Sequence, residues 1–186
     1  MKVWELDSDA NNYDNVTLSN ESDWDKLMAY GFHGKSIKDT WMPFCVEEIE
    51  SIRKGDNPGF FGSSPVFSRK AVKVLKKYLD NNTEILPLMY RKKNHFSKEE
   101  YFVINVINLI DCIDYERAEV KRFKNSDEIL RFIKYAFKSE VIKNEHIFKI
   151  PELKGRVFVS EEFRQRVMDK DLKGFKFELV WDSQLK

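Results

Sequence analysis

The residues best suited to chemistry lie in one short segment, Asp111-Cys112-Ile113-Asp114, directly after the most strand-like stretch of the chain. Two carboxylates this close together could bind a metal ion or exchange protons, with Cys112 as a nucleophile between them. The same pattern is typical of a tight turn, in which Asp111 and Asp114 accept backbone hydrogen bonds while Cys112 or Ile113 returns to the core. Because no histidine lies nearby in the sequence and no third acid completes a motif, we favour the turn.

Motifs for other kinds of catalysis are absent from the sequence. The three histidines, His33, His95 and His146, have no second histidine, cysteine or aspartate at a metal-ligand spacing. The chain contains no P-loop, no Gly-x-Gly-x-x-Gly and no Gly-x-Ser-x-Gly. The sequence therefore predicts a protein that is not an enzyme and that uses no metal or cofactor.

A second candidate feature is the basic face of a helix expected over residues 69–80. It carries Arg69, Lys70, Lys73, Lys76 and Lys77. Such a stripe could grip phosphates, but aromatic residues are not interleaved along it, as they are where nucleic-acid bases stack. The whole chain has 32 basic and 31 acidic residues, whereas nucleic-acid binders usually carry a basic excess. We therefore expect a solvated helix face and no nucleic-acid partner.

Composition places the chain among single-domain proteins with a substantial core. Its 186 residues are 42% hydrophobic and 14% aromatic. No apolar stretch approaches the roughly 20 residues that span a bilayer, and the first seven residues lack the apolar region of a signal peptide. Cys45 and Cys112 are expected to be free thiols. These features predict a cytoplasmic protein that does not associate with membranes.

Hydrophobic periodicity and turn residues predict mixed secondary structure. Strands are expected over 2–6, 84–90, 101–107, 118–123, 146–150, 156–159 and 175–181, and helices over 24–30, 69–80, 127–139 and from 161 to about 170. Residues 8–22 and 54–65 have loop composition, and a regular element is expected over 44–52, where Val46, Ile49 and Ile52 are three residues apart. Pro87 suggests an edge strand or a bulge.

This order of elements predicts an α+β fold, with a mostly antiparallel sheet packed against two or three helices. We expect residues 1–63 to form an N-terminal segment with short elements and a long aromatic loop. Residues 64–186 would form the core α+β region. The two parts are expected to make one compact domain.

Several short motifs occur in a recognisable order from residue 64 onwards. They are Pro65-Val66-Phe67-Ser68, Glu84-Ile85-Leu86-Pro87-Leu88, Tyr101-Phe102-Val103-Ile104-Asn105-Val106, Ile110-Asp111-Cys112-Ile113-Asp114, Ile147-Phe148-Lys149-Ile150, Val157-Phe158-Val159-Ser160-Glu161 and Leu172-Lys173-Gly174-Phe175-Lys176-Phe177. In this order they resemble bacterial immunity proteins of polymorphic toxin systems, first catalogued as a domain of unknown function. The resemblance implies a cytosolic antitoxin that occludes a cognate toxin, usually encoded beside it. It carries over no catalytic residues.

Candidate partner-binding residues are the aromatics of the loop-rich region, Trp41, Phe60 and Phe61. Aromatic side chains on Gly/Pro-rich loops are good anchors for a partner, although these three could instead fold back over the sheet. The expected function is therefore toxin neutralisation by steric occlusion. The alternatives are a hydrolase or metal-dependent enzyme using residues 111–114 and a nucleic-acid-binding module using residues 69–77. The sequence leaves the oligomeric state open.

Overall fold

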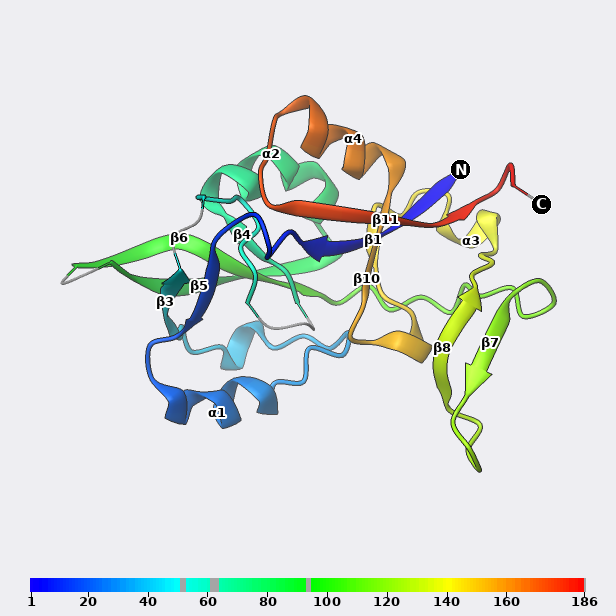
Figure 1. The fold of residues 1–186 in the computed structure, drawn as a ribbon, viewed down its shortest axis with the longest axis horizontal. Coiled ribbons are helices and arrows are strands. Elements are labelled where there is room, and N and C mark those ends of the chain that lie inside the picture. The colour runs from blue at the N-terminus through cyan, green and yellow to red at the C-terminus, as the bar shows by residue number, and fades with distance from the viewer. Residues whose placement is uncertain (51–52, 61–63, 93–94, 186) are drawn as a thin grey trace.

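The computed structural model describes residues 1–50, 53–60, 64–92 and 95–185 (Figure 1). They form two main sheets, a separate two-stranded hairpin and four α-helices, which confirms the expected α+β class. The five-stranded sheet has the order β2 (Asn15–Leu18), β3 (Cys45–Glu50), β5 (Thr83–Lys92), β6 (His95–Val106) and β4 (Val66–Ser68). Its strands pair antiparallel except for β3 and β5, which are parallel.

The second sheet has four antiparallel strands. Their order is β11 (Phe175–Asp182), β1 (Lys2–Ser8), β10 (Val157–Ser160) and β9 (Ile147–Phe148). The hairpin consists of β7 (Glu119–Arg122) and β8 (Ile129–Lys134), and it projects from the body of the molecule (Figure 1). The helices are α1 (Trp24–Ala29), α2 (Arg69–Leu79), α3 (Ser139–Ile142) and α4 (Glu161–Asp169), with short 3-10 turns η1 (Glu21–Asp23), η2 (Lys38–Thr40) and η3 (Pro151–Leu153).

The two longest helices begin where their sequence signals place them. The Ser68 hydroxyl accepts a hydrogen bond from the Ala71 N–H at 3.1 Å, and the Ser160 hydroxyl accepts one from the Phe163 N–H at 3.2 Å. Each cap satisfies an N–H that has no partner within its helix and typically contributes about 1 kcal/mol. The capping residues therefore fix the starts of α2 and α4.

A hydrophobic core lies between these helices and the two sheets. It includes Leu6 of β1, Leu75 of α2, Ile104 of β6 and Phe163 of α4. Burying each such side chain stabilises the fold by about 1.5–3 kcal/mol. A second cluster, with α1, covers the other face of the five-stranded sheet, and a third lies between the four-stranded sheet and the hairpin. The sheets thus meet through one shared core.

Strands from both ends of the chain meet in the four-stranded sheet. β1 lies between β10 and β11, so that Leu6 is opposite Val157 on one side and Phe177 on the other. In the five-stranded sheet, β2 and β3 continue the sheet formed by β5, β6 and β4. Each main sheet therefore combines strands from before and after residue 63.

A buried carboxylate fastens the loop after α1 to the five-stranded sheet. Glu84 of β5 accepts hydrogen bonds from the Ser36 hydroxyl at 2.5 Å, the Ile37 N–H at 2.9 Å and the Asn105 amide at 2.9 Å. Burial alone would raise the pKa of Glu84, but these hydrogen bonds outweigh it and lower the pKa. The carboxylate therefore stays charged and holds the loop in place.

The structure corrects three sequence expectations and shows that the regular element expected over 44–52 contains a strand. Residues 127–139 do not form a helix. Ser126 accepts a hydrogen bond from the Glu128 N–H in a turn, and β8 follows. Within the expected loop 8–22, Val16 and Leu18 of β2 are buried in the sheet. Residues 45–50 form a strand, with Ile49 exposed, and Ile52 lies outside the described residues. β6 begins at His95 rather than near Tyr101, while the expected bulge at Pro87 is confirmed by a register shift between Pro87 and Met89.

Candidate partner-binding surface

A cleft of about 550 Å³ opens where β1 approaches the loop before β4. Its walls come from β1, residues 57–60, the start of β4 and the turn between η3 and β10. It belongs to no single local element, because its lining comes from three distant parts of the sequence, near residues 5–15, 57–66 and 153–157. Only the folded chain presents it.

Two buried polar atoms on this cleft have no hydrogen-bond partner among the described residues. They are Oδ1 of Asn57, which is 1% exposed, and Oγ of Ser64, which is 3% exposed. The Asn57 amide nitrogen donates to the carbonyl of Asp7 at 3.0 Å, which fixes the side chain in place. Leaving a buried polar group without a partner costs about 1–3 kcal/mol. The wall of the cleft therefore contains a buried acceptor and a buried hydroxyl that have no partner among the described residues.

One wall of the cleft carries a charge pair between strands. Arg156, just before β10, forms an ion pair with Glu5 of β1. Burial raises the pKa of the Glu5 carboxyl above its ordinary value, and the Arg156 guanidinium opposes that rise only in part. The pair places a half-exposed guanidinium at the cleft and joins β1 to β10.

The structure describes two of the three predicted aromatic anchors, and both pack against the second cluster. Phe60 is half-buried, lines the cleft and lies 5.7 Å from the Trp24 ring, centroid to centroid. Trp41 packs between Tyr30 and Phe44 at 5.1 and 5.3 Å, and its indole N–H donates to the Pro87 carbonyl at 3.0 Å. Phe61 lies outside the described residues. Only Phe60 is therefore placed at the cleft.

Residues 111–114 do not form the expected turn. Ile113 makes an antiparallel β-bridge with Phe137, and the turn follows at residues 115–117. The Asp114 N–H donates to the Ala136 carbonyl at 2.9 Å, and the Lys138 N–H donates to the Cys112 carbonyl at 2.8 Å. Asp114 Oδ1 accepts from the Glu116 N–H at 3.1 Å. Burial raises the pKa of the Cys112 thiol to about 12, so it stays protonated and unreactive. In the described ranges, no three His, Cys, Asp or Glu residues are grouped to hold a metal ion.

The basic face of α2 is exposed, as expected, and some of its cations already interact with neighbouring side chains. Lys70 forms an ion pair with Asp56 at 3.3 Å, and the Lys77 ammonium lies 4.5 Å from the Tyr78 ring centroid. A cation held against a carboxylate or an aromatic ring is less available to a phosphate backbone. The geometry therefore favours the solvated helix face.

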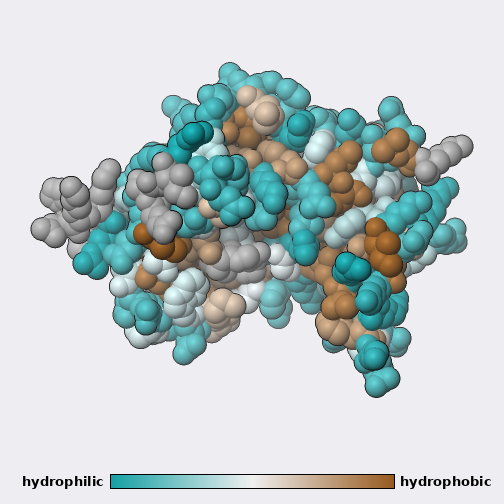
Figure 2. Space-filling model, in the orientation of Figure 1, coloured by the Kyte–Doolittle hydropathy of each residue, from teal (hydrophilic) through white to brown (hydrophobic). Residues whose placement is uncertain are grey.

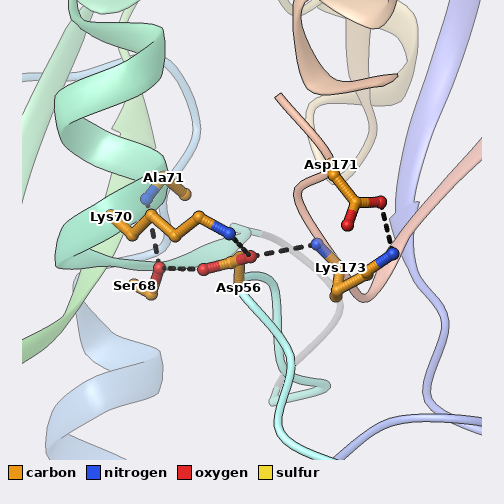
Figure 3. Close-up of polar contacts among 6 residues, drawn as sticks. All are labelled: Asp56, Ser68, Lys70, Ala71, Asp171 and Lys173. Atoms are coloured by element: carbon orange, nitrogen blue, oxygen red, sulfur yellow. Dashed lines mark hydrogen bonds and ion pairs between the residues drawn. The ribbon is translucent and has the colours of Figure 1, made fainter. Parts of the chain in front are cut away.

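Sequence reasoning missed the residue that positions the cleft loop, Asp56. Its carboxylate accepts hydrogen bonds from the Ser68 hydroxyl at 2.7 Å and the Lys173 N–H at 3.0 Å, and it pairs with Lys70 (Figure 3). Asp56 thus joins the loop that carries Asn57 and Phe60 to the N-terminus of α2 and to the segment before β11. The Asp-Asn-Pro-Gly sequence signals a turn, but nothing in it indicates these distant partners.

No α-helix in the described ranges is long and apolar enough to cross a bilayer.

Comparison with known sequences identifies the family of the chain. No curated protein matches the sequence. Residues 52–182 match the family described as immunity proteins (Imm11). The match covers well over half of the chain and includes the cleft loop, residues 111–114 and the hairpin. The chain therefore belongs to the Imm11 immunity protein family.

Proposed function

We propose that this protein binds a cognate bacterial toxin in the cytoplasm and neutralises it by steric occlusion. The observation that carries the proposal is the family match over residues 52–182, because an immunity family indicates a binding role rather than catalysis. The toxin would belong to a polymorphic toxin system and be encoded near this gene. The bridged segment at residues 111–114 and the exposed face of α2 give no support to a second function.

The cleft beside Phe60 is the surface we propose for the toxin. A toxin segment entering it would donate a hydrogen bond to Asn57 Oδ1, reach the Ser64 hydroxyl and pack an apolar side chain on Phe60. Satisfying buried polar atoms on binding adds specificity, because a partner lacking the donor leaves them unpaired. We also propose Phe61 and Trp41 as contacts for the toxin.

A growth assay tests the function directly. The neighbouring open reading frame is expressed in a tolerant host with and without this protein, and the pair is then co-purified. The proposal expects growth arrest by the neighbour alone, rescue by this protein, and a stable complex. Rescue without a complex would contradict occlusion. A neighbour that arrests growth equally in both strains would contradict the immunity function.

Single variants test the aromatic set. Phe60→Ala and Phe61→Ala are expected to weaken toxin binding by about tenfold or more if these side chains are anchors. Met168→Ala is a matched control, because Met168 is 56% exposed on α4, away from the cleft lining. Parent-like affinity of both Phe variants would remove them from the interface. Trp41→Ala requires a stability measurement alongside, because Trp41 packs within the aromatic cluster.

A further inference from the structure

The β7–β8 hairpin contains two irregularities, both in β8. In the antiparallel register Glu119 is opposite Lys134, Val120 is opposite Phe132, Lys121 is opposite Arg131, and Arg122 is opposite Ile129. The pairing therefore skips Ile133 and Leu130, which are the extra residues of two β-bulges. Bulges change the direction of side chains, often at functional surfaces.

The two skipped residues are apolar and face solvent. Ile133 is 64% exposed and Leu130 is 41% exposed. Phe132 between them is buried in the third cluster and stacks on Tyr135 at 4.6 Å. Apolar residues gather over this hairpin on the face shown in Figure 2. Phe132 thus anchors the hairpin to the body, while the bulges leave two aliphatic side chains available to a partner.

The two strands of the hairpin carry an excess of positive charge. Lys121, Arg131 and Lys134 are exposed, and none of them forms an ion pair with a described residue. Glu119, opposite Lys134, is the one acidic residue of these two strands. Aliphatic side chains beside an excess of cations complement an apolar surface with an acidic rim. The charge therefore identifies the kind of surface that would cover the hairpin.

The base of the hairpin adjoins the cleft. Leu153 of η3 lines the cleft and also packs against the third cluster, which contains Phe132. Tyr135, directly after β8, lies close enough to Glu5 and Arg156 for their charges to influence it. The cleft and the base of the hairpin are therefore neighbours in the fold, so one partner can reach both.

We propose that the hairpin is a docking arm for the toxin. Leu130 and Ile133 would insert into an apolar patch, and Lys121, Arg131 and Lys134 would face acidic residues around that patch. This inference rests on the proposed function, since the occupant is the toxin.

The test measures binding of purified, catalytically inactivated toxin to the full chain by calorimetry. The double variant Leu130→Ser/Ile133→Ser is expected to weaken binding by about 30-fold or more, as for interface anchors. Met168→Ser is the matched control, because it places the same polar residue at another exposed apolar position. It is expected to bind like the parent. Circular dichroism and thermal unfolding confirm that each variant is folded.

A charge-reversal variant keeps the test decisive if the serine variant does not fold. Arg131→Glu/Lys134→Glu alters only exposed side chains and is expected to slow toxin association at least about tenfold at low salt, with a weaker salt dependence. Folded variants that bind and associate like the parent would overturn the docking arm and leave the immunity function standing. If the unmodified protein neither binds the toxin nor protects cells, the proposed function itself fails.

Two other outcomes would also overturn the proposal. Dimerisation that the serine variant abolishes, with toxin binding unchanged, would assign the hairpin to self-association. Salt-sensitive binding to DNA or RNA that charge reversal abolishes, with toxin binding unchanged, would assign it to nucleic acid.

Discussion

Raising the pH is expected to stabilise this protein through one buried lysine. The Lys149 side chain is fully buried, and its ammonium donates a hydrogen bond to the Phe32 carbonyl at 2.7 Å. Burial lowers the pKa of Lys149 from 10.5 to about 8. At neutral pH the folded protein therefore carries the cost of a charge that has little contact with water.

The sign and the size of the effect follow from proton binding. Between pH 8 and 10.5 the unfolded chain keeps the Lys149 proton, while the folded protein releases it. The unfolded state then binds more protons, so the free energy of unfolding rises with pH. The two pKa values correspond to about 3 kcal/mol in total, of which about 2 kcal/mol is gained between pH 7.5 and 9.5.

Urea unfolding at pH 7.5, 8.5 and 9.5 measures this gain against Lys149→Met, which has no proton to release. The Cys112 thiol, with its pKa raised to about 12, acts in the opposite direction above pH 9. It is present in both proteins, so it cancels in the difference. Lys149→Arg, which stays charged throughout, is a second reference. Stability curves that run parallel for the parent and both variants would refute the reasoning.

Three further predictions concern the core and the cleft loop. Trp41→Ala is expected to lower the free energy of unfolding in urea by about 2–3 kcal/mol. Trp41→Phe is expected to lower it by clearly less, because the contacts with the Tyr30 and Phe44 rings remain. Equal losses would contradict this packing. Asp56→Asn should lower the free energy of unfolding by about 1–3 kcal/mol. Asp171→Asn, at an exposed ion pair, should lower it by clearly less. The reverse order would exclude the role given to Asp56. In a Cys45→Ser variant, the Cys112 thiol should resist a thiol reagent until the protein is unfolded, and rapid labelling of the native protein would show that it is accessible.

The sequence predicts the elements whose signals are local. Ser68 and Ser160 precede apolar stripes at helical spacing, and both residues cap helices in the structure. The turn expected at residues 111–114 lies instead at residues 115–117. Asp114 marks its start, because its carboxylate accepts a hydrogen bond from the Glu116 N–H. Pro87 correctly predicted the bulge of β5, because proline has no N–H to pair with a neighbouring strand.

Features that depend on distant partners were not predictable. β8 was expected to be a helix because Ile129, Leu130 and Ile133 are spaced like a helical stripe. Each bulge inserts a residue into the alternation of a strand, which produces the same spacing. The cleft escaped prediction for another reason. Asn57 and Arg156 are about a hundred residues apart in the sequence and meet only through the tertiary fold.

The place of β1 between β10 and β11 has a consequence for synthesis. During translation β1 emerges early and has no partner in its sheet until residues 157–182 have followed. Until then it is an unpaired strand with two open edges, which is the form most open to wrong pairing. The cleft wall that β1 supplies is therefore among the last features to form, because its sheet is complete only after β11 has been synthesised.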